Sequence, residues 1–523
     1  MHSGKGAGVL KIQRTKNAIR NLVSGGILKL LNMVLPFILR SMMLHALGVQ
    51  YLGLNGLFRS ILSFLNLAEL GVDSAMMFSM YKPIAEDDTD TICALMKLYR
   101  TFYRRIGLFI AVAGIALTPF LRGLISGSIP QGLNLYLLYF MNLGNTVLTY
   151  WLFSYKNCLL NAHQRNDVSS RITLVIQIAE YALKYIALVK FRNYYLYLAI
   201  QLLKQIAINL CIALRATHMF PQYTPRGCLP REKVHQIVLR VRDLMTAKFS
   251  FFIFNSADTL IISAFMGLTA LALYQNYLFV IISLRTLLEV AVTACIAGVG
   301  NSLITENAEK NYRDFERLSL LYCWLIAICT AMLLCLFQPF MQLWMGEDNL
   351  LSFRHIVCFA VYFYLLAIHQ FMNMFKDAAG IWRLDRWRPL FGALVNVGLN
   401  LATVRWLGLY GILLSSILSI AVIQLPWLIA HLFREVFPGK YLRKYVHTLF
   451  LFLLVALASC TGAWKLCSQF QLALWPKLIL NAAISFLVPN LLFFSVFGRS
   501  PLFKESFFQI KRVFSADKKP SLF

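Results

Sequence analysis

Long apolar runs alternate with short polar connections along almost the whole chain. A helix of about 20 apolar residues crosses the hydrocarbon core of a bilayer, and most of these runs reach that length. A window of about 19 residues predicts an all-α polytopic membrane protein with about 14 transmembrane helices, within a range of 12 to 14. The expected spans lie near residues 22–47, 52–81, 106–125, 135–153, 172–189, 194–214, 249–265, 278–303, 318–340, 356–375, 390–404, 409–432, 446–464 and 478–497.

The spans form two series of six, separated by a polar stretch and followed by a final pair. Two lobes with an even number of helices insert in the same orientation, related by a pseudo-two-fold axis along the membrane normal. Between them, Val234, Ile237 and Val241 alternate with basic residues at helical spacing, which predicts a helix in the cytoplasmic interface; the alternative is a partner-binding helix. The predicted parts are an N-lobe (1–215), an amphipathic cytoplasmic linker (216–248), a C-lobe (249–434), a final helix pair (435–497) and a basic cytoplasmic tail (498–523).

Composition and charge placement support a membrane location. Hydrophobic residues make up 59% of the chain and charged residues 14%, whereas soluble domains are roughly a quarter charged. The net charge of +27 sits mostly in short loops on one side of the predicted spans, so nucleic acid is not expected as a partner. This asymmetry predicts that both termini and the linker lie in the cytoplasm. The outer loops hold only Arg122, Lys190, Arg192, Arg405, Lys465 and Lys477.

One predicted span carries a polar stripe. On a continuous helix over 52–81, Asn55, Arg59, Asn66 and Asp73 share one face, with Glu69 beside them. A charge in mid-membrane costs about 2.5–3.5 kcal/mol, so it normally faces a partner or an aqueous cavity. Along such a helix Glu69 lies about 15 Å and Asp73 about 21 Å from Arg59, too far for direct contact. We therefore expect the stripe to line a cavity.

Other charges also fall inside predicted spans. Glu180 with Lys184, and Arg285 with Glu289, are four-residue pairs that can neutralise each other, while Lys204 and Asp258 have no partner nearby in sequence. Arginine binds phosphate through a planar fork of donors, so cavity arginines suit a phosphate-bearing headgroup. The candidate substrate-binding residues are Arg59, Arg40, Arg285, Lys29, Asn55 and Asn66; the candidate Na⁺ or H⁺ coupling residues are Asp258, Asp73, Glu69 and Glu180. The 11 cysteines form no metal-ligand spacing, and we expect neither a metal nor another cofactor.

Three segments are similar to the opening hairpin of bacterial oligosaccharide flippases, within the multidrug, oligosaccharidyl-lipid and polysaccharide exporter superfamily. They are LGVQYLGLN (47–55), LAELG (67–71) and FSMYKP (78–83). The resemblance implies a bacterial plasma membrane location and alternating access between two six-helix lobes. It further implies export of an undecaprenyl-pyrophosphate-linked oligosaccharide for surface polysaccharide biosynthesis. It also implies that Arg40, Arg59 and Arg285 engage the pyrophosphate. The chain departs from the family by placing Asp258 in the first helix of the C-lobe, with only one central arginine there.

The partners implied are the lipid-linked oligosaccharide, membrane lipids and other polysaccharide-assembly proteins. One alternative is a drug or metabolite antiporter of the same superfamily, coupled to Na⁺ or H⁺ through Asp73, Glu180 or Asp258; the excess of cations favours an anionic cargo instead. A second alternative is a membrane polysaccharide polymerase or ligase. The longest external connection, 341–355, carries no recognisable catalytic set, so an enzyme is not expected.

Overall fold

The computed structural model describes residues 14–69, 71–127, 129–130, 132–381 and 384–506. This part of the chain is almost entirely helical and contains no strand, which confirms the predicted fold class. Ten helical stretches within it are long and apolar enough to cross a membrane. Two of them, Ser256–Thr293 and Arg388–Glu435, are interrupted by a glycine with non-helical backbone angles. The count of 14 spans stays a prediction.

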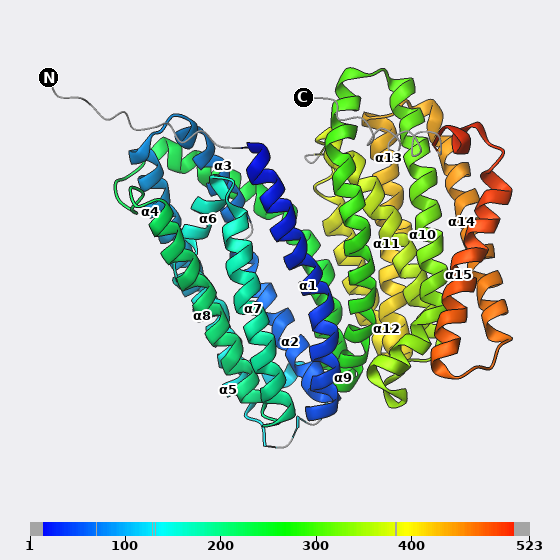
Figure 1. Ribbon diagram of the computed structural model, residues 1–523, viewed down its shortest axis with the longest axis horizontal. Helices are drawn as coiled ribbons and strands as arrows, with labels where there is room; N and C mark the ends of the chain where they lie inside the picture. The colour runs from blue at the N-terminus through cyan, green and yellow to red at the C-terminus, as the bar shows by residue number, and fades with distance from the viewer. Residues whose placement is uncertain (1–13, 70, 128, 131, 382–383, 507–523) are drawn as a thin grey trace. The chain divides into compact units, whose positions relative to one another are not determined.

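The chain divides into two compact units, residues 1–269 and 270–523 (Figure 1). The predicted lobes were divided by their expected membrane spans and not by compactness, so their boundaries stay predictions. The first unit contains α1 (Arg14–Leu47), α2 (Val49–Leu65), η1 (Asn66–Glu69), α3 (Val72–Ala85), α4 (Thr89–Leu117), η2 (Thr118–Leu124), α5 (Leu135–Trp151), α6 (Tyr155–Ala162), α7 (Asn166–Val189), α8 (Tyr194–Met219) and the beginning of α9 (Arg231–Thr305).

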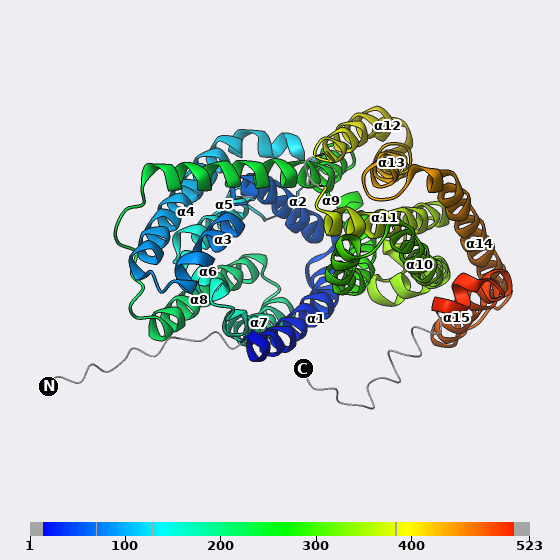
Figure 2. The same ribbon diagram turned by 90° about the horizontal axis from the view of Figure 1, so that it is seen from above.

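Five helices of the first unit form a closed ring. Helix α1 packs along α7, α7 along α8, α8 along α5, α5 along α2, and α2 returns to α1. Figure 2 shows these helices from above, with α1 between α7 and α2. A ring of five helices surrounds a central space. Helix α2, which carries the first part of the polar stripe, is one of the five.

The second predicted span is not one helix. Helix α2 ends at Leu65, a 3₁₀ turn follows, and Gly71 adopts a left-handed conformation (φ 98°) before α3 begins at Val72. Such a positive φ is costly for any residue with a side chain. The prediction that Asp73 shares a helix face with Asn55 and Arg59 is therefore wrong, because the turn changes the direction in which later side chains point.

The predicted cytoplasmic linker is continuous with the next span. Helix α9 begins at Arg231 and runs without a break until Gly267 (φ 84°), because neither proline nor glycine occurs between them. The completely buried Ser263 hydroxyl donates to the carbonyl of Leu124, and the Ser126 amide donates to the carbonyl of Ser263. These bonds attach α9, shortly before Gly267, to the end of η2 and the residues that follow it, within the first unit.

The second unit contains the rest of α9, then α10 (Ala308–Met345), η3 (Glu347–Asn349), α11 (Phe353–Ala379), α12 (Arg388–Leu418), the π-helical η4 (Ser419–Gln424), α13 (Leu425–Glu435), η5 (Gly439–Tyr441), α14 (Leu442–Ser468) and α15 (Leu474–Phe497). Helix α10 is its centre and packs against α11, α14 and α15. The Phe315 ring of α10 is fully buried and lies 4.6–4.8 Å from the ring centres of Phe375, Phe437 and Tyr445. Each buried aromatic ring removes a large apolar area from solvent, so these contacts stabilise the packing of α10.

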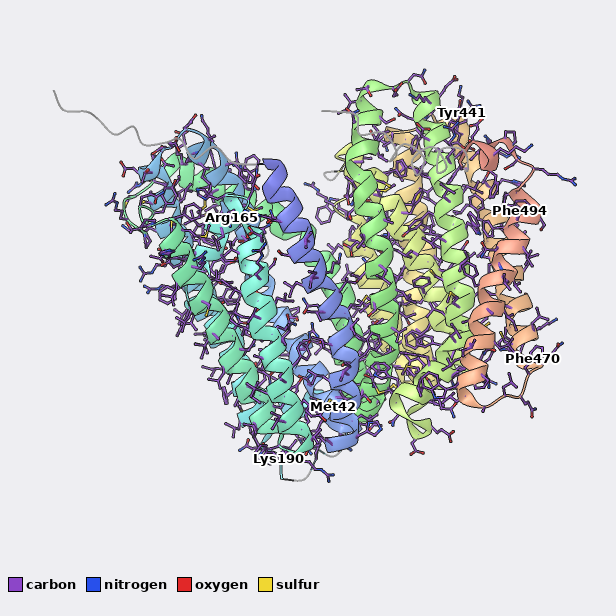
Figure 3. The ribbon with its side chains drawn as sticks, in the orientation of Figure 1. Met42, Arg165, Lys190, Tyr441, Phe470 and Phe494 are labelled. Carbon is purple, nitrogen blue, oxygen red and sulfur yellow. The ribbon has the colours of Figure 1, made fainter. Side chains whose placement is uncertain are left out.

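The outward faces of both units are apolar. Leu214 and Ile479 are each 71% exposed, and Phe470 and Phe494, labelled in Figure 3, are 46% and 65% exposed. A water-soluble monomer rarely exposes apolar side chains over such an area. Buried polar groups such as Glu180 and Arg388 lie inside the units instead. This distribution, with the ten apolar helical stretches, identifies a multi-pass membrane protein whose outer surface contacts lipid.

Candidate functional site

The first unit contains a polar cavity of about 430 Å³, which is lined by its ring of five helices. Helix α1 contributes Arg40; α2 and η1 contribute Asn55, Arg59 and Asn66; and α5 contributes Asn145. Helices α7 and α8 complete the wall with alternating polar side chains, among them Gln177, Glu180, Tyr181, Lys184, Gln201 and Lys204. Asn55 and Arg59 are four residues apart on α2, so they lie on one face of this helix and both line the cavity.

Positive charge predominates in this cavity. Its wall carries four cations, Arg40, Arg59, Lys184 and Lys204, against a single carboxylate, that of Glu180. The guanidinium groups of Arg40 and Arg59 are near enough to repel each other. Arg59 forms no hydrogen bond or ion pair with the rest of the described chain and is exposed to the cavity. An anionic guest would relieve this repulsion, whereas a cationic one would increase it.

Glu180 is bound to two of the cations. Its carboxylate lies 2.8 Å from the Lys184 ammonium, one turn along α7, and 3.7 Å from the Lys204 ammonium of α8. The side chains of Glu180 and Lys184 are each 6% exposed, while that of Lys204 is 24% exposed. The expected Glu180–Lys184 pair is therefore present, and it also forms part of the cavity wall.

Two amides give the cavity further hydrogen-bonding capacity. The side-chain oxygens of Asn66 and Asn145 are buried but accept no hydrogen bond from the described protein. An unsatisfied buried oxygen costs about 1–3 kcal/mol. A hydroxyl-rich guest would supply the missing donors, so the cavity combines cationic groups with polar acceptors.

The structure brings together five of the predicted residues: Arg40, Arg59, Asn55, Asn66 and Glu180. The others lie elsewhere. Lys29 is exposed on α1 outside the cavity wall, and Asp258 is buried in the first part of α9. Arg285 belongs to the second unit, where its buried Nε atom has no hydrogen-bond partner among the described residues. Lys184 and Lys204 were missing from the predicted site. A charged residue within each of two consecutive spans is the signal that could have placed them there.

Glu69 and Asp73 face tyrosines. Tyr103 and Tyr150 each donate a hydrogen bond of 2.5 Å to the Glu69 carboxylate, and Tyr99 donates one of 2.8 Å to Asp73. Neither carboxylate lines the cationic cavity. The phenols supply the donors that a cation would otherwise provide, and they link α4 and α5 to the broken segment between α2 and α3.

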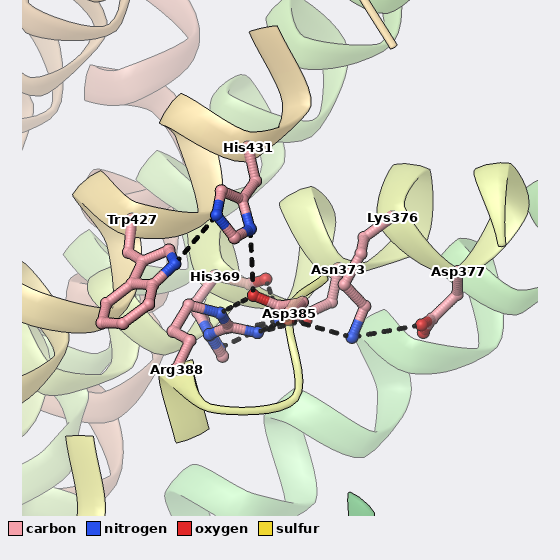
Figure 4. Close-up of polar contacts among 8 residues, drawn as sticks. All are labelled: His369, Asn373, Lys376, Asp377, Asp385, Arg388, Trp427 and His431. Atoms are coloured by element: carbon pink, nitrogen blue, oxygen red, sulfur yellow. Dashed lines mark hydrogen bonds and ion pairs between the residues drawn. The ribbon is translucent and has the colours of Figure 1, made fainter. Parts of the chain in front are cut away.

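The second unit contains a buried charged cluster, drawn in Figure 4, that the sequence did not predict. Arg388 forms two hydrogen bonds of 2.6 Å with the Asp385 carboxylate and others with His369 and Asn373 of α11. Arg388 is 1% exposed and Asp385 is 3% exposed. Lys376 adds an ion pair with Asp385 at 3.5 Å. The cluster fixes the connection between α11 and α12, and it resembled an ordinary charged loop in the sequence.

Comparison with known proteins gives the fold a precedent. No protein-family model and no curated protein sequence matches the chain. Among solved structures, a lipid II flippase MurJ in an inward closed conformation matches with a TM-score of 0.67 and 14% identity, over 92% of this chain and 99% of that one. An inward-facing multidrug resistance MATE family transporter of the MOP superfamily matches with a TM-score of 0.56 and 15% identity, over 82% and 99%. A MOP superfamily transporter from Pyrococcus furiosus matches with a TM-score of 0.51 and 13% identity, over 85% and 100%. The chain therefore has the fold that the lipid II flippase shares with transporters of the MOP superfamily.

Proposed function

We propose that the protein is a flippase that moves an undecaprenyl-pyrophosphate-linked oligosaccharide to the outer leaflet of the bacterial plasma membrane, for surface polysaccharide biosynthesis. The observation that supports this most is the cationic cavity of the first unit, with four cations around one carboxylate. A pyrophosphate diester is an anion that such a wall attracts. The fold is also that of a solved lipid-linked-substrate flippase.

In this proposal the cavity residues divide according to their chemistry. Arg40 and Arg59 direct guanidinium forks at the pyrophosphate, while Asn55, Asn66 and Asn145 bind sugar hydroxyls next to it. A cavity of about 430 Å³ accommodates the charged linkage and adjoining sugar, within the roughly 300–1,000 Å³ usual for small-molecule sites. The polyprenyl tail stays in lipid along the apolar outer faces, so only the polar head crosses.

Movement of the head requires two states that expose the cavity to opposite sides of the membrane. Na⁺ or H⁺ would bias these states through one of four carboxylates, those of Asp258, Asp73, Glu69 and Glu180. Arg285 is the candidate pyrophosphate contact of the second unit.

The proposed partners are the lipid-linked glycan, membrane lipids and other polysaccharide-assembly proteins. Both termini lie in the cytoplasm, and the protein catalyses no covalent step.

A cation-coupled antiporter is the second candidate, because MATE family transporters share the fold. Those transporters are named for multidrug resistance, and a cationic drug would meet repulsion from Arg40, Arg59 and Lys204 in this cavity. An anionic metabolite would not. Binding of undecaprenyl pyrophosphate compared with that of a small anion therefore distinguishes the two candidates.

The test uses the purified full-length chain in detergent and undecaprenyl pyrophosphate as the ligand. Arg59→Ala should weaken binding about tenfold or more, because it removes a charge-assisted contact of about 1.5–3 kcal/mol. Arg59→Lys should be intermediate, since it keeps a point charge without the fork. Binding is measured by the shift in melting temperature across a ligand titration.

Lys29→Ala is the matched control, because it removes a cation that lies on α1 but outside the cavity wall. It should bind the lipid like the unaltered protein. In cells, loss of the gene should leave the lipid-linked glycan on the cytoplasmic face and remove the surface polymer. Intact surface glycan together with new sensitivity to cationic drugs would contradict the flippase and support the antiporter.

A further inference from the structure

We propose that Glu180 is an internal counter-anion, which holds Lys204 while the cavity is empty and releases it to the substrate pyrophosphate. This inference rests on the proposed flippase function and assigns Glu180 a role opposite to that of the cavity cations. By competing with the substrate, the carboxylate weakens binding and allows the headgroup to leave. Glu180 is thus a positioning residue for Lys204 and not a contact of the pyrophosphate.

The two lysines that contact Glu180 are held very differently. Lys184 lies 2.8 Å from Glu180, donates a hydrogen bond of 3.4 Å to Gln201, and lies 4.1 Å from the centre of the Tyr197 ring. It is only 6% exposed. These contacts surround the ammonium group, so Lys184 is a fixed part of the wall.

Lys204 is the lysine able to change partners. It lies 3.7 Å from Glu180, beyond ordinary hydrogen-bond distance, and its side chain is 24% exposed. The positive charges of Lys184 and Arg59 both repel it. A flexible four-carbon stem lets an ammonium group follow a mobile anion. A pyrophosphate near Arg59 would therefore draw Lys204 away from its long, shared contact with Glu180.

The exchange leaves no buried charge without a partner. When Lys204 turns to the substrate, the Glu180 carboxylate keeps its close contact with Lys184. This matters because removing one partner of a buried ion pair is strongly destabilising. When the headgroup leaves, Lys204 returns to Glu180. The cavity therefore has a charge partner for Lys204 both with and without substrate.

Release explains why a transporter would retain such a carboxylate. Four cations without a competing anion would bind a pyrophosphate tightly in every state, and a ligand that binds all states equally shifts none of them. A counter-anion lowers the affinity of the cavity for the pyrophosphate without removing any cation. It follows that neutralising Glu180 should improve binding and slow transport.

The experiment compares variants of the full-length protein in binding of undecaprenyl pyrophosphate and in its translocation in liposomes. Glu180→Gln combined with Lys184→Met replaces the buried pair with neutral side chains of similar size, so no buried charge is left alone. This double variant should bind about tenfold more tightly and translocate more slowly, because Lys204 is no longer shared. Lys204→Met should bind about tenfold more weakly. Glu180→Asp, which keeps the charge but withdraws it by one methylene, should change both quantities in the same direction as the double variant, by less.

The outcomes separate this inference from the proposed function. If the unaltered protein binds the lipid but the double variant and Glu180→Asp bind it equally or more weakly, Glu180 is not a competitor and the inference is wrong. If the unaltered protein does not bind the lipid at all, the proposed function fails and the inference fails with it. Tighter binding with unchanged translocation would contradict the role in release.

Discussion

Arginine and lysine contribute different chemistry to the two charged sites of this protein. In the first unit, Arg59 faces the cavity and forms no hydrogen bond with the residues that the structure describes, while Lys184 is enclosed by a carboxylate, an amide and a ring. In the second unit, Arg388 uses its planar group to join Asp385, His369 and Asn373. A guanidinium can bind a guest or bridge several fixed groups, and the described neighbours determine which it does.

The Arg388 cluster carries a prediction about stability at the residue scale. Arg388→Leu should lower the free energy of unfolding by about 3–5 kcal/mol, because it leaves the buried Asp385 carboxylate without its main partner. Arg386→Leu is the control, since Arg386 is exposed in the same connection, and should change stability by less than about 0.5 kcal/mol. Thermal unfolding in detergent measures both. Equal melting temperatures would show that Lys376 alone satisfies the carboxylate.

The sequence revealed charges of the candidate site but not the buried Arg388 cluster of the second unit, for a physical reason. Arg40, Arg59 and Glu180 were predicted because a charge inside an apolar span is costly and visible in one dimension. Asp385, in the connection after α11, and Arg388, the first residue of α12, pack back against α11, so only the three-dimensional structure shows that they are buried. Burial of a loop charge leaves no trace in hydropathy.

At the scale of elements, the spans themselves were largely predictable and the breaks within them were not. Hydropathy located the helices because lipid requires about 20 apolar residues for each crossing. A helical wheel assumes an unbroken helix, and Gly71 ends that continuity between α2 and α3. Gly267 and Gly408 likewise interrupt α9 and α12. Few polar residues surround either glycine, so hydropathy does not show these breaks.

Close packing of α2 against α9 just after Gly267 leads to a prediction at the element scale. A Cβ atom at Gly53 would lie 2.0 Å from the carbonyl oxygen of Leu268, so no side chain fits without moving one helix. Gly53→Ala should therefore destabilise the protein by about 1–3 kcal/mol. Gly144→Ala on α5 is the control: open space surrounds that position, and alanine should stabilise the helix by up to about 1 kcal/mol. Melting temperatures that change in the same direction would contradict the close contact.

At the scale of the whole molecule, charge asymmetry predicts the side of the membrane on which each connection lies. In a variant without its 11 cysteines, Arg226→Cys before α9 should resist an impermeant maleimide in intact cells. Asp348→Cys in η3, on the predicted outer side, should react. Both positions are exposed, so access to the reagent depends on the side and not on burial. Labelling of the Arg226 position before permeabilisation would reverse the predicted orientation.

The glycine break in α9 has a consequence for the protein's resistance to proteolysis. As one straight rod, its 75 residues would extend about 110 Å, far beyond a hydrocarbon core of about 30 Å. Gly267 turns the chain within a single residue, so two helical stretches follow each other with no extended loop. Proteases cleave preferentially at exposed loop tips. A protein whose helices turn in this way offers a shaving protease almost no substrate there, and an inserted epitope at Gly267 would create the cleavage site that the native chain lacks.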